Sequence, residues 1–416
     1  MLFGSSGIRR RFDQDLIRIA LHAGSALGSR GDTIILGTDT RTTNGILSSA
    51  LISGVLSSGG NVQTAGIVPT PVVAYATRTV SAGCMVTASH NPEEYNGLKL
   101  FNPDGSSFTK VQQETLARQI ETSDWSDWTH QGDLSPSDAI TPYTESVLEK
   151  VHVSRELKVV LDCGCGAGST VSPGLLSRLG VLPVCLNCHS GGHFARQSEP
   201  GESNLLFIPR MMKTTGAQVA VVHDGDADRM MAFDEKGRYI DGDPLLLLFT
   251  SYLGAKKVVT TVDASMAIEE ITEVRRTPVG DSFVSEELLS WGEFGGEPSG
   301  AWIFPRQSYC PDGPYAAALF CEIASEWNVA ETLDTMPHYP VLRESVDLPD
   351  SRELLLAIGA DNPTDGVRLS SEDGWCLVRA SGTEPKIRFT AEGRTLQKAK
   401  EMMERGQELV RKGKTA

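Results

Sequence analysis

A long apolar run is missing from this sequence. Its richest apolar segment, PLLLLF at 244–249, is much shorter than the roughly 18 consecutive apolar residues that a membrane-spanning helix needs. The start, MLFGSSGIRR, has no apolar core of the kind that a signal peptide carries. We therefore expect a cytoplasmic chain without a membrane partner. In that compartment the eight cysteines are expected to be reduced thiols and not disulfides.

An excess of positive charge is also missing. The formal net charge is -15 and the pI is ≈ 5.1, which disfavours a nucleic-acid partner or an anionic membrane, since both bind basic faces. A small anionic substrate is still compatible with this net charge, because a few arginines at a binding site can outweigh the negative potential of the whole chain. The 416 residues, 40% hydrophobic and 22% charged, predict a soluble globular protein of about two to four domains.

Strands and helices alternate over most of the chain, which predicts three successive α/β domains with mixed, mostly parallel sheets. A smaller C-terminal α+β domain follows. The predicted domains are 1–138, 139–236, 237–335 and 336–416. The predicted strands of the first three domains lie within 33–39, 61–71, 83–89, 98–108, 157–162, 181–187, 217–224 and 256–263. The predicted helices are 44–60, 110–121, 169–180, 265–274 and 312–327, and 122–141 is a predicted linker. In the last domain we predict short strands around one helix, over 341–349, 351–360, 374–380 and 386–392, closed by a helix over 395–413.

Ser89, in TASHNP at the end of a predicted strand, is a candidate nucleophile. Neighbouring residues on an extended chain point in opposite directions, so His90 is badly placed to be its base. No G-x-S-x-G elbow is present, and the hydrolase interpretation is weak. A Ser-His-Asn-Pro turn with only local hydrogen bonds is the structural alternative.

Three aspartates, Asp224, Asp226 and Asp228, alternate in HDGDADRMMAF directly after an apolar strand. Their carboxylates can converge on one cation, and oxygen ligands suit Mg²⁺ or Ca²⁺. The spacing resembles an EF-hand loop as far as Glu235. Arg229 replaces the required glycine, however, and MMAF is a returning strand, so we reject the EF-hand. A solvated acidic turn is the alternative to a metal site.

Two further loops have binding chemistry. In RASGTEPKIRF (379–389), small residues and hydroxyls between Arg379 and Arg388 form a candidate phosphate cradle, unless the segment is only a hairpin turn with solvated arginines. In GGEPSGAWIF (295–304), glycines flank an exposed acid, Glu297, and a hydroxyl, Ser299, which suit sugar hydroxyls. That second pattern is weak by itself.

Two motifs point elsewhere. VVLDCGCGAGST (159–170) resembles the opening of an S-adenosylmethionine-dependent methyltransferase, but the following strand ends at Asn187 without the ribose-binding acid. CLNCH (185–189) matches a haem-attachment pattern, although nothing supports export. Four thiols could also meet at a sheet edge and bind zinc, and we prefer the simpler account of buried thiols. These thiols are Cys163, Cys165, Cys185 and Cys188.

TASHNP, DGDADR, GGEPSG and RASGTEPKIR, in this order, resemble the four signature loops of the α-D-phosphohexomutase family. GSSGIRR, GTDTRTTN and GIVPTP resemble further segments of its first domain, so the resemblance spans the chain. It implies four domains around a central cleft, each contributing one loop. It also implies a phosphohexomutase that cycles a phosphoryl group through Ser89 and a hexose 1,6-bisphosphate, which is both intermediate and activator.

The resemblance also implies residue roles. The implied catalytic residues are Ser89, Lys99, Arg9 and His90. The implied ligands of one Mg²⁺ are Ser89, Asp224, Asp226 and Asp228. The implied substrate-binding residues are Arg229, Glu297, Ser299, Arg379, Ser381, Gly382, Thr383 and Arg388. We expect Lys99 to transfer protons, its pKa lowered by nearby cations.

Departures from the family bear on the substrate. Arg10 stands where a glycine is usual, Ala301 stands where bacterial phosphoglucosamine mutases have a histidine, and HFARQSEP (193–200) only loosely resembles the family's Phe-Pro segment. The GEPxGAW form resembles an archaeal branch assigned to glucosamine 6-phosphate and glucosamine 1-phosphate. A phosphomannomutase/phosphoglucomutase is the alternative. Alternatives of another class are the methyltransferase and a non-catalytic sugar-phosphate sensor. We expect a monomer or homodimer.

Overall fold

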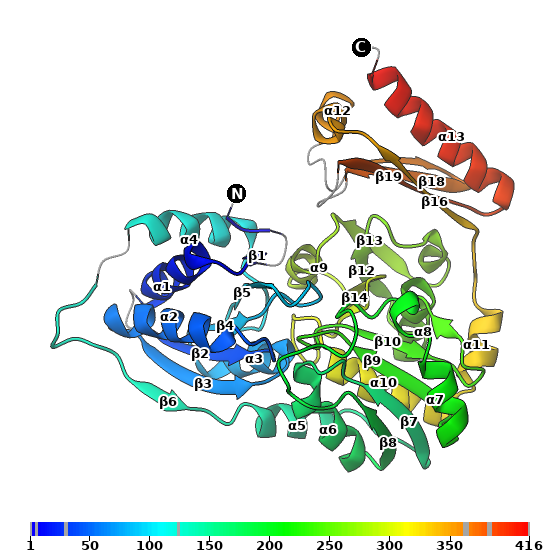
Figure 1. Cartoon of the computed structure of the whole chain (residues 1–416). Coiled ribbons are helices and arrows are strands. Elements are labelled where there is room, and N and C mark those ends of the chain that lie inside the picture. Colours follow the sequence, from blue (N-terminus) through cyan, green and yellow to red (C-terminus); the bar gives the residue numbers. More distant parts are fainter. Residues whose placement is uncertain are drawn as a thin grey trace.

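The structure, a computed structural model, describes residues 2–4, 7–28, 32–122, 125–360, 366–380 and 385–414. Four sheets follow one another along the chain. In Figure 1 the first domain (blue to cyan) lies on one side and the green and yellow parts lie together on the other, while the orange and red C-terminal domain stands above them. No helix in the described ranges is long and apolar enough to cross a membrane.

The first domain contains a six-stranded sheet in the order β1-β5-β4-β2-β3-β6. Strands β4, β2, β3 and β6 are parallel, and β5 and β1 are antiparallel at one edge. Its elements are β1 (Ile8–Arg11), α1 (Gln14–Gly28), β2 (Thr33–Thr38), α2 (Asn44–Ser57), β3 (Asn61–Ile67), α3 (Thr70–Ala76), η1 (Thr77–Thr79), β4 (Ala82–Val86), β5 (Tyr95–Phe101), α4 (Lys110–Thr122) and β6 (Leu134–Pro136). Part of the predicted linker 122–141 is therefore an edge strand.

The second domain contains a five-stranded sheet in the order β11-β10-β9-β7-β8, with β9, β7 and β8 parallel. Strands β9 and β10 pair antiparallel with His223 opposite Met230, so the three aspartates lie in the turn between two buried strands. Its elements are α5 (Ile140–Leu148), β7 (Leu157–Asp162), η2 (Ala167–Thr170), α6 (Ser172–Arg178), β8 (Val181–Leu186), η3 (Glu202–Asn204), α7 (Ile208–Thr215), β9 (Val219–His223), β10 (Met230–Phe233) and β11 (Tyr239–Ile240).

The third domain contains a four-stranded sheet in the order β13-β12-β14-β15. Its elements are α8 (Gly242–Leu253), β12 (Lys257–Thr261), η4 (Met266–Glu270), β13 (Glu273–Thr277), α9 (Asp281–Leu288), β14 (Phe294–Glu297), β15 (Ala301–Ile303), α10 (Gly313–Glu326) and α11 (Val329–Thr335). The predicted helix over 265–274 is only partly right, because Met266–Glu270 form the short 3-10 helix η4 but the residues from Glu273 onward join the sheet. Pairing with β12 along all of β13 satisfies the backbone polar groups there and outweighs the helical pattern.

The C-terminal domain is an antiparallel sheet in the order β16-β19-β18-β17, covered by helices. Its elements are β16 (Val341–Asp347), α12 (Ser351–Ala357), β17 (Val367–Ser371), β18 (Gly374–Ala380), β19 (Lys386–Gly393) and α13 (Leu396–Gly413). The segment 351–360, which we group with the short strands, forms a helix, and β17 is a strand that we do not predict. Helix α12 lies against the sheet with Leu355 buried in the domain's own core.

Apolar cores join the first three domains. One continuous core contains residues of the second and third domains together with one face of the first domain's sheet. The other face of that sheet packs against α1 and α2. The C-terminal domain has a separate core and meets the third domain through a small cluster around Trp375, Leu377 and Met266. The first three domains therefore hold one another in place more firmly than they hold the fourth.

Candidate active site

Ser89 is fully buried just beyond the end of β4, in a turn where its own backbone is left-handed, with φ 51. Its hydroxyl donates a hydrogen bond to Asp224 Oδ2 at 2.8 Å, although the two residues belong to different domains. Its backbone N–H donates to Thr87 Oγ1 at 2.8 Å. The serine side chain is thus aimed at the aspartate turn of the second domain.

His90 lies closer to the Ser89 hydroxyl than an extended chain would allow. Its Nδ1 is 3.4 Å from Ser89 Oγ, so the expectation that the two side chains diverge is wrong. The left-handed turn at Ser89 is the reason. The Arg229 cation, burial, and the Arg9 and Lys99 cations lower the pKa of His90 well below its usual range, so the ring is neutral at physiological pH.

The three aspartates form a buried cluster in which one carboxylate oxygen of each lies within 4.8 Å of those of the other two. Asp226 Oδ1 and Asp228 Oδ1 are buried and have no hydrogen-bond partner. Burial, with the charges of Asp228 and Asp226, raises the pKa of Asp224 well above its usual range. Orphaned oxygens and repelling carboxylates in one pocket fit a hard divalent cation such as Mg²⁺.

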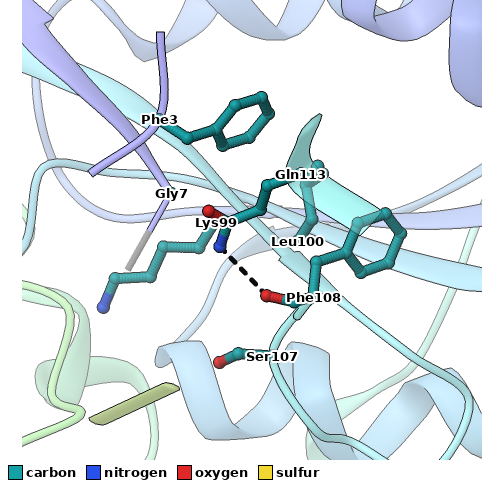
Figure 2. A pocket seen from close by; sticks show the side chains of 7 residues that line it. All are labelled: Phe3, Gly7, Lys99, Leu100, Ser107, Phe108 and Gln113. Carbon is teal, nitrogen blue, oxygen red and sulfur yellow. Dashed lines mark hydrogen bonds between the residues drawn. The ribbon is translucent and has the colours of Figure 1, made fainter. Parts of the chain in front are cut away.

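Lys99, on β5 opposite Met85 of β4, reaches the same cluster. Figure 2 shows its side chain extending away from a small cavity of the first domain, lined also by Phe108 and Gln113, toward the neighbouring green ribbon. Its Nζ contacts Asp226 Oδ2 at 2.7 Å and also Asp228. Burial opposes the charge, but these two carboxylates outweigh it and raise the pKa of Lys99. The expected lowering of this pKa by cations is therefore wrong.

Two arginines bring further positive charge to the cluster. Arg9 lies on β1 opposite Gly97, and its Nε is buried without a hydrogen-bond partner. Arg229 follows the last aspartate, with its backbone N–H 3.3 Å from Asp224 Oδ1. Its guanidinium lies 3.5 Å from Glu199.

Glu297 ends β14 and is buried, not exposed as we expect from its glycine-rich loop. Its carboxylate accepts the Gly280 N–H at 2.8 Å, and the Ser299 hydroxyl lies 3.5 Å away. Burial, followed by the charges of Asp281 and Asp263, raises the pKa of Glu297 to about 8. Near neutral pH this group is therefore largely a carboxylic acid that can donate as well as accept.

The predicted phosphate cradle is only partly within the described residues. Arg379 on β18 and Arg388 on β19 are direct cross-strand partners, half-buried and exposed respectively. Ser381, Gly382 and Thr383 lie outside the described residues.

The structure adds a site residue that sequence reasoning missed. Thr70 donates its hydroxyl to Asp226 Oδ2 at 2.5 Å and its backbone N–H to the Asp226 carbonyl at 2.9 Å. It fixes the central aspartate from the first domain. The signal was present in GIVPTP, whose threonine follows a strand at the same sheet edge as Ser89.

The glycine-rich turn after β7 supports the aspartate turn. Ala167 N–H donates to the Gly225 carbonyl at 2.8 Å, and a Cβ on Gly166 would lie 2.5 Å from that same oxygen. The turn that resembles a methyltransferase opening thus packs directly against the aspartate turn. Among the described residues, the aspartates are the single group of three or more His, Cys, Asp or Glu side chains with the spacing of a metal site, and the four thiols do not have this spacing.

Comparisons with known proteins cover the whole chain. The phosphoglucomutase/phosphomannomutase family matches as alpha/beta/alpha domain I over residues 1–127, domain II over 141–237, domain III over 241–339 and the C-terminal domain over 345–408. A probable phosphoglucosamine mutase of Methanosarcina barkeri is 43% identical over 413 residues, covering 94% of this chain and 95% of the relative. The phosphoglucosamine mutase of Methanocaldococcus jannaschii is 39% identical over 446 residues, covering 100% and 99%. The crystal structure of a phosphoglucomutase/phosphomannomutase family protein from Burkholderia thailandensis matches with a TM-score of 0.88 at 25% identity, covering 99% of this chain and 97% of that one.

Proposed function

Because this chain belongs to the phosphoglucomutase/phosphomannomutase family, the α-D-phosphohexomutases, we propose that it interconverts glucosamine 6-phosphate and glucosamine 1-phosphate through a phosphoserine at Ser89. The enzyme class is an isomerase that moves a phosphoryl group within a hexose phosphate. The glucosamine substrate is supported by the archaeal relatives named phosphoglucosamine mutase. The observation that carries the proposal is the hydrogen bond of 2.8 Å from the buried Ser89 hydroxyl to Asp224.

In the proposed reaction, phosphorylated Ser89 donates its phosphoryl group to the free hydroxyl of a hexose monophosphate, which gives a 1,6-bisphosphate. The bisphosphate then reorients within the cleft, so that its other phosphate is transferred back to Ser89. Such transfers need alignment and charge neutralisation more than covalent help. Mg²⁺ held by Asp224, Asp226, Asp228 and the phosphoserine would neutralise charge that develops on the transferring group.

The basic side chains divide the remaining work. Lys99 is an ammonium in the resting site because its pKa is raised. We propose that it supplies positive charge and donates a proton to the serine oxygen as that oxygen leaves, and that the proton lost by the attacking sugar hydroxyl restores the ammonium. Arg9 adds a second positive charge. The Ser89 hydroxyl proton is directed to Asp224, so neutral His90 donates its Nδ1–H to Ser89 Oγ.

The substrate is held by two loops in this proposal. Glu297 and Ser299 contact sugar hydroxyls in either orientation of the ring, and Arg229 is a further substrate-binding residue in this proposal. The phosphate that does not react is bound by the C-terminal domain. The residues proposed for it are Arg379, Ser381, Gly382, Thr383 and Arg388.

The wider setting is part of the same proposal. The partner is a small sugar phosphate, activated by a hexose 1,6-bisphosphate, and neither nucleic acid nor membrane takes part. We propose a cytoplasmic enzyme that acts as a monomer or homodimer. A phosphomannomutase/phosphoglucomutase is the second candidate, favoured by the description of the matching family itself.

A ³¹P NMR time course tests the function. The protein with Mg²⁺ and a trace of glucose 1,6-bisphosphate receives glucosamine 6-phosphate, mannose 1-phosphate or glucose 1-phosphate in separate tubes, beside Ser89→Ala. We expect glucosamine 6-phosphate to interconvert fastest, and all turnover to vanish in Ser89→Ala. Faster conversion of mannose or glucose 1-phosphate would transfer the assignment to the second candidate. Folded protein that converts none of them would leave a sugar-phosphate sensor in its place.

A further inference from the structure

One hydroxyl of the second domain connects two turns of the site. These are the turn around Ser89 (residues 87–93, the serine turn) and the turn that carries Asp224, Asp226 and Asp228 (the aspartate turn). Ser198 is 5% exposed and lies in HFARQSEP, the segment that departs from the family pattern. Its Oγ accepts the Gly225 N–H at 2.8 Å, between the first two aspartates. The same Oγ donates to the Ser89 carbonyl at 3.2 Å. Ser198 therefore spans the two loops on which phosphoryl transfer depends.

Arg41 of the first domain holds the same carbonyl. Its Nη2 donates to the Ser89 carbonyl and to the Asn91 carbonyl, each at 2.7 Å. Its Nη1 donates to the carbonyls of Pro92 and Tyr95 at 2.6 and 2.8 Å. The guanidinium is almost fully buried and is paired with Asp39, so it is an internal brace of the turn and not a ligand for solvent anions.

The segment that carries Ser198 also packs against Arg41. The ring of Phe194 lies 5.1 Å from the Arg41 guanidinium carbon. The Phe194 N–H donates to the Glu93 carboxylate at 2.6 Å. Residues 193–198 of the second domain thus contact the serine turn through His193 and Phe194, both at Glu93, and through Ser198 at the Ser89 carbonyl. Phe194 also packs against Arg41, which holds that turn.

The turn needs such support because its backbone is strained. Ser89 has a φ of 51, a left-handed conformation that residues with a side chain rarely adopt. Rotation of this peptide would swing the Ser89 hydroxyl away from Asp224. A displacement of about 1 Å at a reacting group is enough to reduce a rate by about 100-fold.

We propose that Ser198 and Arg41 are positioning residues, which clamp the Ser89 carbonyl from two domains and so set the distance between the phosphoryl carrier and the metal-binding turn. This inference rests on the proposed function. Neither side chain touches the sugar, so both act on the rate of transfer and not on substrate binding.

The test compares Ser198→Ala and Arg41→Lys with Ser25→Ala. Ser25 is also buried and hydrogen-bonded, to Ser58 at 2.7 Å between α1 and α2 and away from the catalytic cluster. We expect kcat to fall by about 10- to 100-fold in Ser198→Ala and at least as much in Arg41→Lys, with KM within about threefold of the parent. Ser25→Ala should keep kcat. Hydrogen exchange of residues 87–93 should rise in the two positioning variants alone.

Two outcomes overturn the inference. One is an unchanged kcat and unchanged exchange in Ser198→Ala. The other is a loss of kcat that Ser25→Ala shares in proportion to its loss of melting temperature, since this would be a general effect on folding. Failure of the proposed function is distinct, because the parent enzyme itself would then be inactive, while the exchange measurement would still report on the clamp.

Discussion

At the scale of single residues, the charges around Ser89 decide what each group can do. Lys99 lowers the pKa of Asp226 against the effect of burial, while burial and neighbouring carboxylates raise that of Asp224. The carboxylates of Asp226 and Asp228 raise the pKa of Lys99 against the effect of burial. The cluster therefore combines one firmly ionised carboxylate, two carboxylates with a raised pKa and one ammonium group. That combination suits metal binding and charge stabilisation better than general base catalysis.

Asp312 provides a pH-dependent prediction at this scale. Burial raises its pKa to about 7. The hydrogen bond of 2.5 Å from Tyr143, the Tyr315 N–H and the Lys150 cation each lower the pKa, but burial outweighs them. Its Oδ2 is buried without a partner. The folded protein favours the protonated, neutral form of Asp312. This preference contributes to the free energy of unfolding below about pH 4, and the contribution is lost as the pH rises toward 7, by up to about 1.4 kcal/mol per pH unit.

We expect Asp312→Asn to remove this dependence. The asparagine can still accept from Tyr143 and the Tyr315 N–H, but it cannot ionise. Thermal unfolding of both proteins between pH 4 and pH 8 measures the effect as a difference. The melting temperature of Asp312→Asn should increase relative to that of the parent protein as the pH rises. A constant difference across the range would contradict the prediction.

At the scale of elements, the site assembles where strands end. Ser89 follows β4, Asp224 follows β9 and Glu297 closes β14, each a strand in the parallel part of its sheet. Ligands of open α/β sheets bind at the carboxyl ends of such strands, because the loops there converge. Each of the first three domains therefore presents its loop at the carboxyl end of a parallel strand, whereas the fourth domain has an antiparallel sheet.

The contact between α1 and α2 gives a prediction at this scale. A Cβ on Gly54 of α2 would lie 1.9 Å from the Leu21 carbonyl of α1, whereas a Cβ on Gly45 of the same helix meets nothing within 4 Å. Gly54→Ala should force the helices apart and cost about 1–3 kcal/mol of unfolding free energy. The matched variant Gly45→Ala should be neutral or stabilising by up to about 1 kcal/mol. Thermal melts of both variants measure this, and equal melting temperatures would refute the close-packing argument.

At the scale of the whole molecule, the C-terminal domain is attached through few contacts. Glu392 of β19 is fully buried at the junction. One of its oxygens, Oε2, accepts both the Met266 N–H at 2.8 Å and the Trp375 Nε1–H at 2.6 Å, while the other accepts the Ser265 hydroxyl. A carboxylate can accept all three bonds, and an amide cannot.

We therefore expect Glu392→Gln to loosen the fourth domain. Because this domain carries the proposed phosphate-binding arginines, KM for the sugar phosphate should rise by about 10-fold, as expected for a lost buried charged hydrogen bond, with a smaller change in kcat. Protease cleavage near the junction at 336–341 should become faster. An unchanged KM with unchanged cleavage would show that the junction does not depend on this residue.

The sequence by itself determined the four loops, their order and the strands that carry them. These features depend on residues close together in the chain: an apolar strand followed by alternating aspartates, or small residues between two arginines. Most strands and long helices followed from the same local periodicity. Within 265–274 and over 351–360, contacts with distant strands or with a separate core outweighed the local pattern. Helices α1 and α8 and strand β17 were not predicted.

Only the tertiary structure decided the electrostatics and the positioning of the site. Lys99 meets aspartates 127 and 129 positions away, Thr70 meets one 156 positions away, and Ser198 reaches the Ser89 carbonyl across 109 positions. Glu297 is buried by neighbours that its own glycine-rich loop does not reveal. A pKa and the direction of a hydroxyl depend on which charges and carbonyls fold around them, and these partners come together only when the domains pack.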